Sequence, residues 1–93
     1  MPLMPLCRRY LVSGRVQGVS YRANAERAAQ RIGVRGWVRN LDDGRVEALA
    51  VGSAEELAEF YAWLRRGPRF AEVSAVEVFE EPAQVHADFV IRY

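Results

Sequence analysis

Two short segments contain the residues whose types and spacing could do chemistry. The first runs from Gly14 to Arg22 and reads Gly-Arg-Val-Gln-Gly-Val-Ser-Tyr-Arg, and the second runs from Gly36 to Asn40. The glycines of the first segment permit a tight loop whose backbone N–H groups, those of residues 15–21, point to one place. A helix that starts after this loop would add partial positive charge and the guanidinium of Arg22. These features predict a site for a small oxyanion, above all phosphate.

From the residues alone, other interpretations of these two segments stay open. A glycine-containing loop before a helix can be an ordinary connection, and Arg22 is one of thirteen arginines in a chain without lysine. Asn40 stands before Asp-Asp-Gly and could start a turn through local side-chain hydrogen bonds. For Tyr21 and Trp37, packing in the core or at its rim is favoured over stacking on a substrate. The single histidine, His86, is expected to be structurally incidental.

Length and composition limit the classes of protein that the chain can belong to. Its 93 residues predict a single domain, 1–93, with a flexible start over residues 1–6. A net charge of +1 predicts neither a nucleic-acid partner nor a membrane partner. One cysteine, Cys7, excludes an internal disulfide and a thiolate cluster. The start lacks the apolar stretch of a signal peptide, so we expect a cytoplasmic protein, and a monomer.

The patterns along the chain predict strands and helices that alternate. One helix ends at Gly33, with an apolar stripe at helical spacing formed by Ala25, Ala28, Ala29 and Ile32. Another begins after Ser53, where Glu56 completes a capping box, and its predicted stripe is Leu57, Phe60, Tyr61 and Leu64. Asp42-Asp43-Gly44 predicts a hairpin turn between two strands. The expected strands cover residues 8–13, 34–41, 45–51, 73–79 and 86–93, and the expected helices cover 21–32 and the segment from Ser53 to the Gly67-Pro68 stop.

This order predicts an α+β fold of the ferredoxin-like class. Two β-α-β units give a β-α-β-β-α-β sandwich with a four-stranded antiparallel sheet, both helices on one face and a short extra strand at the C-terminus. The first two strands then run parallel with the third between them, so their carboxyl ends share one edge of the sheet. The loop after Gly14 and the side chain of Asn40 should therefore lie roughly 10 Å apart, a gap that an anion and one water can bridge.

The two segments, followed by Asp43-Gly-Arg-Val-Glu47, closely resemble the paired signatures of the acylphosphatase family over the whole length of the chain. The resemblance implies hydrolysis of acyl phosphates to a carboxylate and inorganic phosphate, which would also bind as product or inhibitor. It implies that Arg22 binds the phosphoryl group and that Asn40 orients the attacking water, without a metal or other cofactor. The phosphate cradle would comprise the backbone amides of Arg15, Val16, Gln17, Gly18, Val19, Ser20 and Tyr21.

Two positions depart from the family pattern. Tyr21 stands where phenylalanine is frequent, and we expect its hydroxyl to be tolerated at the rim of the site. Leu41 stands where some members carry threonine, so any auxiliary hydroxyl at that position is absent here.

Two other classes of function compete with hydrolysis. One is a non-catalytic ferredoxin-like module that binds an anion or carbamoyl phosphate. The other is an RNA-binding ferredoxin-like domain, which is disfavoured because the chain lacks the aromatic-rich strand motif of RNA-stacking sheets and is nearly neutral.

Overall fold

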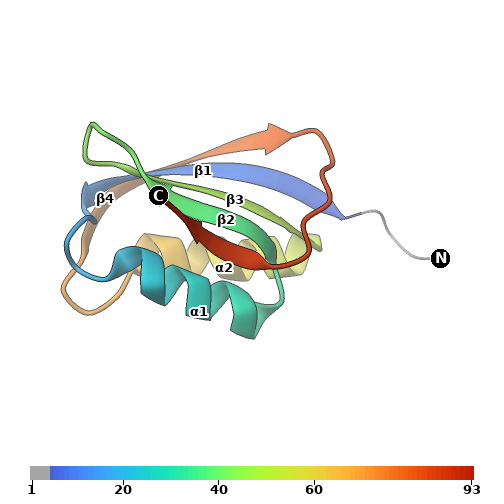
Figure 1. Cartoon of the computed structure of the whole chain (residues 1–93), viewed down its shortest axis with the longest axis horizontal. Helices are drawn as coiled ribbons and strands as arrows, with labels where there is room; N and C mark the ends of the chain where they lie inside the picture. The colour runs from blue at the N-terminus through green and yellow to red at the C-terminus, as the bar shows by residue number, and fades with distance from the viewer. Residues whose placement is uncertain (1–4) are drawn as a thin grey trace.

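A computed structural model describes residues 5–93 and shows two layers, a sheet and a pair of helices that cover one of its faces (Figure 1). The order of elements agrees with the expected alternation, and the fold class predicted from the sequence is confirmed. The elements are β1 (Leu6–Arg15), α1 (Tyr21–Ile32), β2 (Arg35–Asn40), β3 (Val46–Gly52), α2 (Ala54–Arg66), β4 (Glu72–Glu81) and β5 (Phe89–Arg92).

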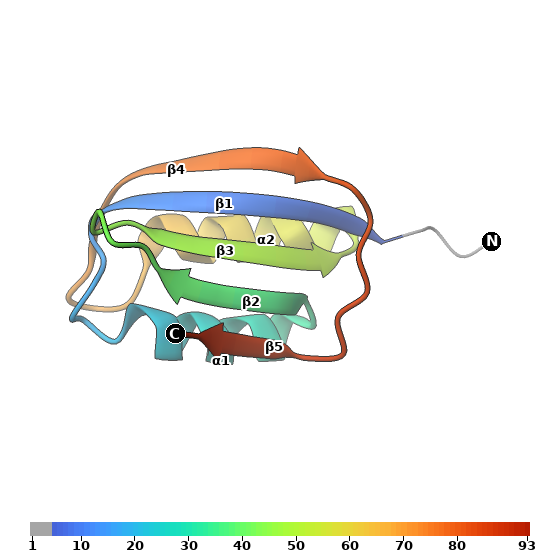
Figure 2. The same cartoon turned by 45° about the horizontal axis from the view of Figure 1, so that its top comes forward.

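The sheet has five strands in the order β4-β1-β3-β2-β5. The first four in sequence pair antiparallel, as predicted. The short extra strand joins the same sheet but runs parallel to β2, with Gly36 opposite Phe89 and Arg39 opposite Arg92. Because β4 and β5 are the two edge strands, the chain passes from one edge of the sheet to the other over residues 82–88 (Figure 2).

The start of the chain is more ordered than the sequence suggested at one position. The expected flexible segment covers residues 1–6, of which 1–4 lie outside the described residues. Leu6 belongs to β1 and pairs with Gly52. Within residues 5–93, no helix is long and apolar enough to cross a membrane.

The core lies between the sheet and the helices and contains the predicted helical stripes. Ala25, Ala28 and Ala29 of α1 are fully buried, and their small side chains let the helix lie close to the sheet. In α2 the buried residues are Leu57, Phe60, Trp63 and Leu64. Trp63 lies outside the predicted stripe, and Tyr61, which was assigned to it, is only partly buried.

Trp37 packs on the other face of the sheet, as part of a small apolar cluster with Cys7, Leu49 and Val51. The guanidinium carbons of Arg39 and Arg92 lie 5.2 and 4.8 Å from its ring centroid, so the ring is covered by cations. Burial, with the nearby Glu81 and Glu80, raises the pKa of the Cys7 thiol. Trp37 is therefore a packing residue, as predicted.

Beside this cluster, a buried carboxylate ties neighbouring strands together. Glu47 of β3 accepts a hydrogen bond from Arg39 Nε at 2.7 Å and another from Arg9 Nη1 at 3.3 Å. The partners supply the charge compensation that a buried carboxylate requires. This arrangement anchors the end of β2, where Arg39 directly precedes Asn40.

A β-bulge directs the chain out of β1. The register against β4 shifts between Ser13 and Gly14, which pairs with Val73. Gly14 has a φ of 124°, and a Cβ at this position would overlap the backbone carbonyl oxygen of Glu72. The close approach of the two backbones therefore requires glycine, and it sets the direction in which the following loop leaves the sheet.

Tyr21 is buried, so the expectation that its hydroxyl lies at a rim is wrong. Its side chain packs against α2, where the ring centroid lies 5.4 Å from that of Trp63. The hydroxyl donates a 2.7 Å hydrogen bond to the Leu64 carbonyl, one of the last-turn carbonyls of α2 that have no partner within the helix. Burial raises the pKa of Tyr21 well above its usual value, so the hydroxyl remains a donor. The first turn of α1 is thereby anchored to α2.

Replacing Gly14 with alanine is expected to lower the free energy of unfolding by about 3 kcal/mol or more, because the new methyl group overlaps fixed backbone. Gly18→Ala is the matched control. Gly18 also has a positive φ, 75°, but no atom lies within 4 Å of an added Cβ, so the cost should be about 1–2 kcal/mol. Urea denaturation of both variants measures the difference, and equal losses would contradict the steric account.

Tyr21→Phe is expected to lower the free energy of unfolding by about 1 kcal/mol, since it removes the hydroxyl from the buried Leu64 carbonyl. Tyr61→Phe removes an exposed hydroxyl that lies 3.4 Å from Arg65 Nη1, and this control should change stability by less than about 0.5 kcal/mol. Denaturation midpoints for the two variants give the comparison. A loss for Tyr21→Phe no greater than that for Tyr61→Phe would refute the anchoring role.

Candidate active site

The loop after β1 and the end of β2 meet at one edge of the sheet, where they enclose a pocket of about 210 Å³. Arg22 and Asn40 both line it, as the strand order predicted. The other lining residues come from the loop, the first turn of α1 and the end of β5: Val16, Gln17, Gly18, Ser20, Tyr21, Ala23, Ile91 and Tyr93.

The loop that lines the pocket has an unusual backbone conformation. Gly18 has a φ of 75°, and Ser20, the residue before α1, has a φ of 60° and a ψ of 28°. Among the described residues, Ser20 is the only non-glycine residue with a positive φ, a costly conformation that concentrates at functional sites. Its side chain makes no capping hydrogen bond to α1. The N–H groups of the first turn are therefore left without that cap, in a helix whose first turn has no acidic residue.

The predicted cradle residues do not all reach the pocket with their side chains. Val16 is buried and belongs to the core cluster, so only its backbone is available to an anion. Arg15 is the last residue of β1 and pairs with Glu72, and Val19 packs partly against the core. Neither of these two lines the pocket. An anion at this pocket would therefore meet the backbone rather than the side chains of these residues.

Arg22 is oriented by the C-terminal segment. Its Nη1 donates to the Arg92 carbonyl at 3.3 Å, and its guanidinium carbon lies 4.9 Å from the centroid of the Tyr93 ring. Ile91 and Tyr93 line the pocket, and no local sequence pattern predicts this because the pairing of β5 with β2 is a long-range contact. The extra strand thus forms one wall of the site.

The turn after Asn40 is closed by its neighbours. Leu41 N–H donates to the Arg45 carbonyl at 2.8 Å, and Gly44 N–H donates to the Leu41 carbonyl at 3.2 Å. The Asp43 carboxylate accepts from the backbone N–H of Arg45 at 3.0 Å and from its Nε at 2.9 Å. These hydrogen bonds lower the pKa of Asp43, and the bond from the backbone N–H of Arg45 has the largest effect. The side-chain hydrogen bonds that stabilise this turn therefore come from Asp43. Asn40, which was considered for that role, lines the pocket.

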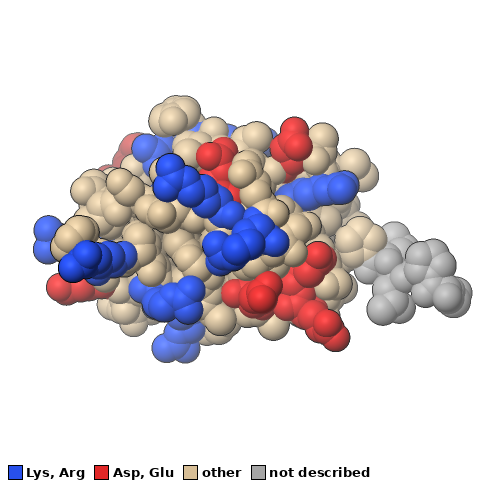
Figure 3. Space-filling model, turned by 90° about the horizontal axis from the view of Figure 1, so that it is seen from below, with Lys and Arg blue, Asp and Glu red and all other residues tan. Residues whose placement is uncertain are grey.

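Charge on the helix face favours anions at this end of the molecule. Arginines spread over the end that carries the loop, and the largest acidic group lies toward the end where α2 begins with Glu55 and Glu56 (Figure 3). The last turn of α2 contributes Arg65 and Arg66. An approaching phosphate compound therefore meets mostly positive charge near the pocket.

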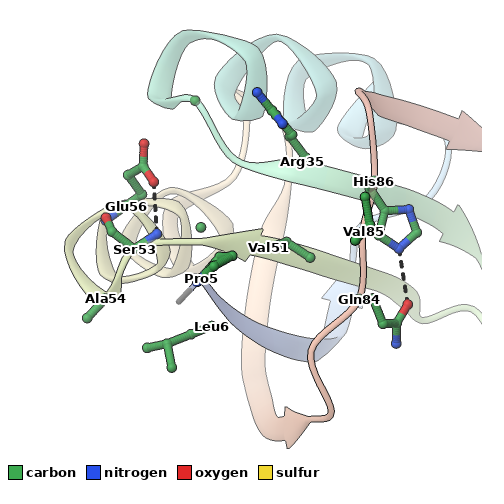
Figure 4. Close-up of a pocket in the computed structure, with 12 residues that line it drawn as sticks. Pro5, Leu6, Arg35, Val51, Ser53, Ala54, Glu56, Gln84, Val85 and His86 are labelled. Atoms are coloured by element: carbon green, nitrogen blue, oxygen red, sulfur yellow. Dashed lines mark hydrogen bonds between the residues drawn. The ribbon is translucent and has the colours of Figure 1, made fainter. Parts of the chain in front are cut away.

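A larger cavity of about 580 Å³ opens at the other end of the sheet, beside the start of β1 and α2 (Figure 4). Several of its polar side chains make local hydrogen bonds. Glu56 accepts from the Ser53 N–H at 2.8 Å, and His86 Nε2 lies 3.1 Å from Gln84 Oε1. The larger cavity is also lined by Arg35, Gln84 and the start of α2, but the two segments that the sequence singled out meet at the smaller pocket, which is therefore the candidate site.

Within residues 5–93, no group of three or more His, Cys, Asp or Glu side chains is placed to hold a metal ion. The groups that can act at the pocket are N–H donors, a permanent cation and a neutral amide. Such groups bind an oxyanion and place a water beside it, and they require no change of protonation state.

Comparison with known proteins agrees with this geometry. The family model described as Acylphosphatase matches residues 8–91. An acylphosphatase of Pseudomonas aeruginosa is 51% identical over 87 residues, which cover 94% of this chain and 96% of the relative. The crystal structure of acylphosphatase from Bacillus subtilis superposes with a TM-score of 0.92 at 39% identity, covering 95% of this chain and 99% of the other.

The fold also occurs within a larger protein. Full-length HypF, solved in a phosphate- and nucleotide-bound form, gives a TM-score of 0.88 over 100% of this chain and 12% of its own length. At 20% identity this similarity concerns the fold alone. The family match and the relatives that correspond over nearly their whole length are decisive: the chain belongs to the acylphosphatase family.

Proposed function

We propose that the chain hydrolyses the carboxyl–phosphate bond of acyl phosphates by direct attack of water, giving a carboxylate and inorganic phosphate. The observation that carries the proposal is the convergence of the loop, Arg22 and Asn40 on one pocket. Membership of the acylphosphatase family supports the same reaction.

The phosphoryl group is held by Arg22 and by the loop amides that line the pocket, those of Val16, Gln17, Gly18, Ser20 and Tyr21. The uncapped start of α1 adds partial positive charge, and the guanidinium can reach two oxygens with its planar fork. In the transition state of phosphoryl transfer, negative charge spreads over the equatorial oxygens. Fixed donors that point at those oxygens stabilise it without reorganising.

Asn40 positions the water on the side of the phosphorus opposite the leaving group. Its carboxamide is carried by the last residue of β2, which is paired with Val46 and therefore held by the sheet. Orienting a water in this way removes much of the entropic barrier to attack. The proton of the water passes to a phosphate oxygen of the substrate, and the carboxylate leaves without a strong general acid because its conjugate acid has a low pKa.

We further propose that the chain acts as a cytoplasmic monomer on small acyl phosphates and binds inorganic phosphate as product or inhibitor. All groups of the pocket come from one chain, so no second copy is needed to complete it. Cys7 is a buried free thiol, which agrees with a reducing compartment.

Arg22→Ala is expected to lower kcat/KM for a simple aromatic acyl phosphate by about 10²–10³-fold or more, since the main charged donor to the phosphoryl oxygens is lost. Arg22→Lys should also be strongly impaired, because an ammonium lacks the planar fork. The control is Arg27→Ala, which removes an exposed arginine from the same helix and should leave the rate near wild type. Wild-type turnover by folded Arg22→Ala would remove this residue from the mechanism, and phosphate binding without any turnover by the unmodified chain would indicate a binding module.

Asn40→Ala is expected to lower kcat by about tenfold or more, because the water loses its orientation while the anion keeps its cradle. The Kd for inorganic phosphate, measured by isothermal titration calorimetry, should change by less than about threefold. Parallel losses in kcat and in phosphate affinity would instead place Asn40 among the groups that bind the anion.

A further inference from the structure

One side chain of the loop between β1 and α1, that of Gln17, lines the pocket and also bonds to a different part of the chain. Gln17 Nε2 donates to the Leu41 carbonyl at 2.8 Å and to the Arg45 carbonyl at 2.9 Å. Leu41 and Arg45 flank the turn between β2 and β3, and Leu41 directly follows Asn40. These partly buried bonds join the loop to the segment that carries the carboxamide of the site.

The turn does not depend on Gln17 for its closure. The Leu41 carbonyl already accepts the Gly44 N–H at 3.2 Å, and the Arg45 carbonyl accepts the Leu41 N–H at 2.8 Å. A carbonyl oxygen has two lone pairs, so each can take the Gln17 bond in addition. Removal of the Gln17 amide therefore leaves neither carbonyl without a donor, and the turn retains its own hydrogen bonds.

The two bonds to Gln17 consequently do something other than hold the turn. They use both hydrogens of one amide nitrogen and are the side-chain hydrogen bonds described between the loop and the turn. The side chain of Leu41 is apolar, so its backbone carbonyl is the group that accepts the hydrogen bond from Gln17. The geometry fixes the loop relative to Asn40 at two points, which limits both sliding and rotation.

We propose that Gln17 is a positioning residue, which holds the phosphate loop in register with Asn40 so that the bound phosphoryl group and the oriented water meet at reacting distance. The inference rests on the proposed function, since it presumes that Asn40 orients the water. A misplacement of about 1 Å is enough to cost up to roughly 10²-fold in rate.

The test is a double-mutant cycle between Gln17 and Asn40. Gln17→Met keeps the length of the side chain and removes both donors. It should lower kcat about tenfold in the otherwise unchanged protein, with the Kd for inorganic phosphate within about twofold of wild type. In the Asn40→Ala background the same substitution should lower kcat by less than about twofold, because no oriented water remains to be misplaced.

Two further variants serve as controls. Gln30→Met makes the same chemical change at an exposed position of α1 and should leave kcat unaltered. Gln17→Asn retains the amide but is shorter by one methylene, so it cannot reach both carbonyls and should lower kcat as Gln17→Met does. Thermal unfolding of each variant checks that these changes do not reflect loss of the fold.

Several outcomes would overturn the proposal. Wild-type kcat for Gln17→Met, an equal loss of kcat with and without Asn40, or a fall in phosphate affinity parallel to the fall in kcat would each do so. Failure of the proposed function appears in different arms of the experiment, namely unchanged turnover in the single Arg22→Ala or Asn40→Ala variants.

Discussion

The site depends first on a constraint of strand pairing. β3 lies between β1 and β2 and pairs antiparallel with both, so β1 and β2 run parallel and end at the same edge of the sheet. The loop that follows β1 and the asparagine that ends β2 therefore meet without any long connection. The bulge at Gly14 then turns the loop toward this edge, and Glu47 ties the ends of β2 and β3 together through Arg39.

On this frame the anion site is built from backbone, with side chains placed to fix that backbone. Tyr21 anchors the first turn of α1 to the end of α2 through the Leu64 carbonyl, and Gln17 joins the loop to the turn after Asn40. Ser20 adopts a left-handed conformation and leaves the start of α1 without a side-chain cap. A loop held in this way keeps its N–H groups aimed before a ligand arrives, which is the condition for electrostatic stabilisation of a transition state.

The larger of the two cavities is not the one that we propose as the active site. The larger cavity is lined by the start of α2, where Glu56 accepts a hydrogen bond from the Ser53 N–H. The smaller pocket is lined by the loop after β1, by Arg22 and by Asn40. Because an oxyanion is bound by convergent donors rather than by apolar volume, the smaller pocket is the one that we propose as the active site.

The amino-acid sequence by itself determined the elements and the main groups of the site. Local rules were sufficient for the capping box at Ser53 and the turn at Asp43-Gly44, and helical spacing located Ala25 and Leu57 in the core. Only the tertiary structure decided that β5 runs beside β2, that the Tyr21 hydroxyl is buried, and that Gln17 reaches across to the next turn. These contacts join residues 24 to 53 positions apart. No local sequence pattern encodes such a contact, because it depends on how whole elements pack.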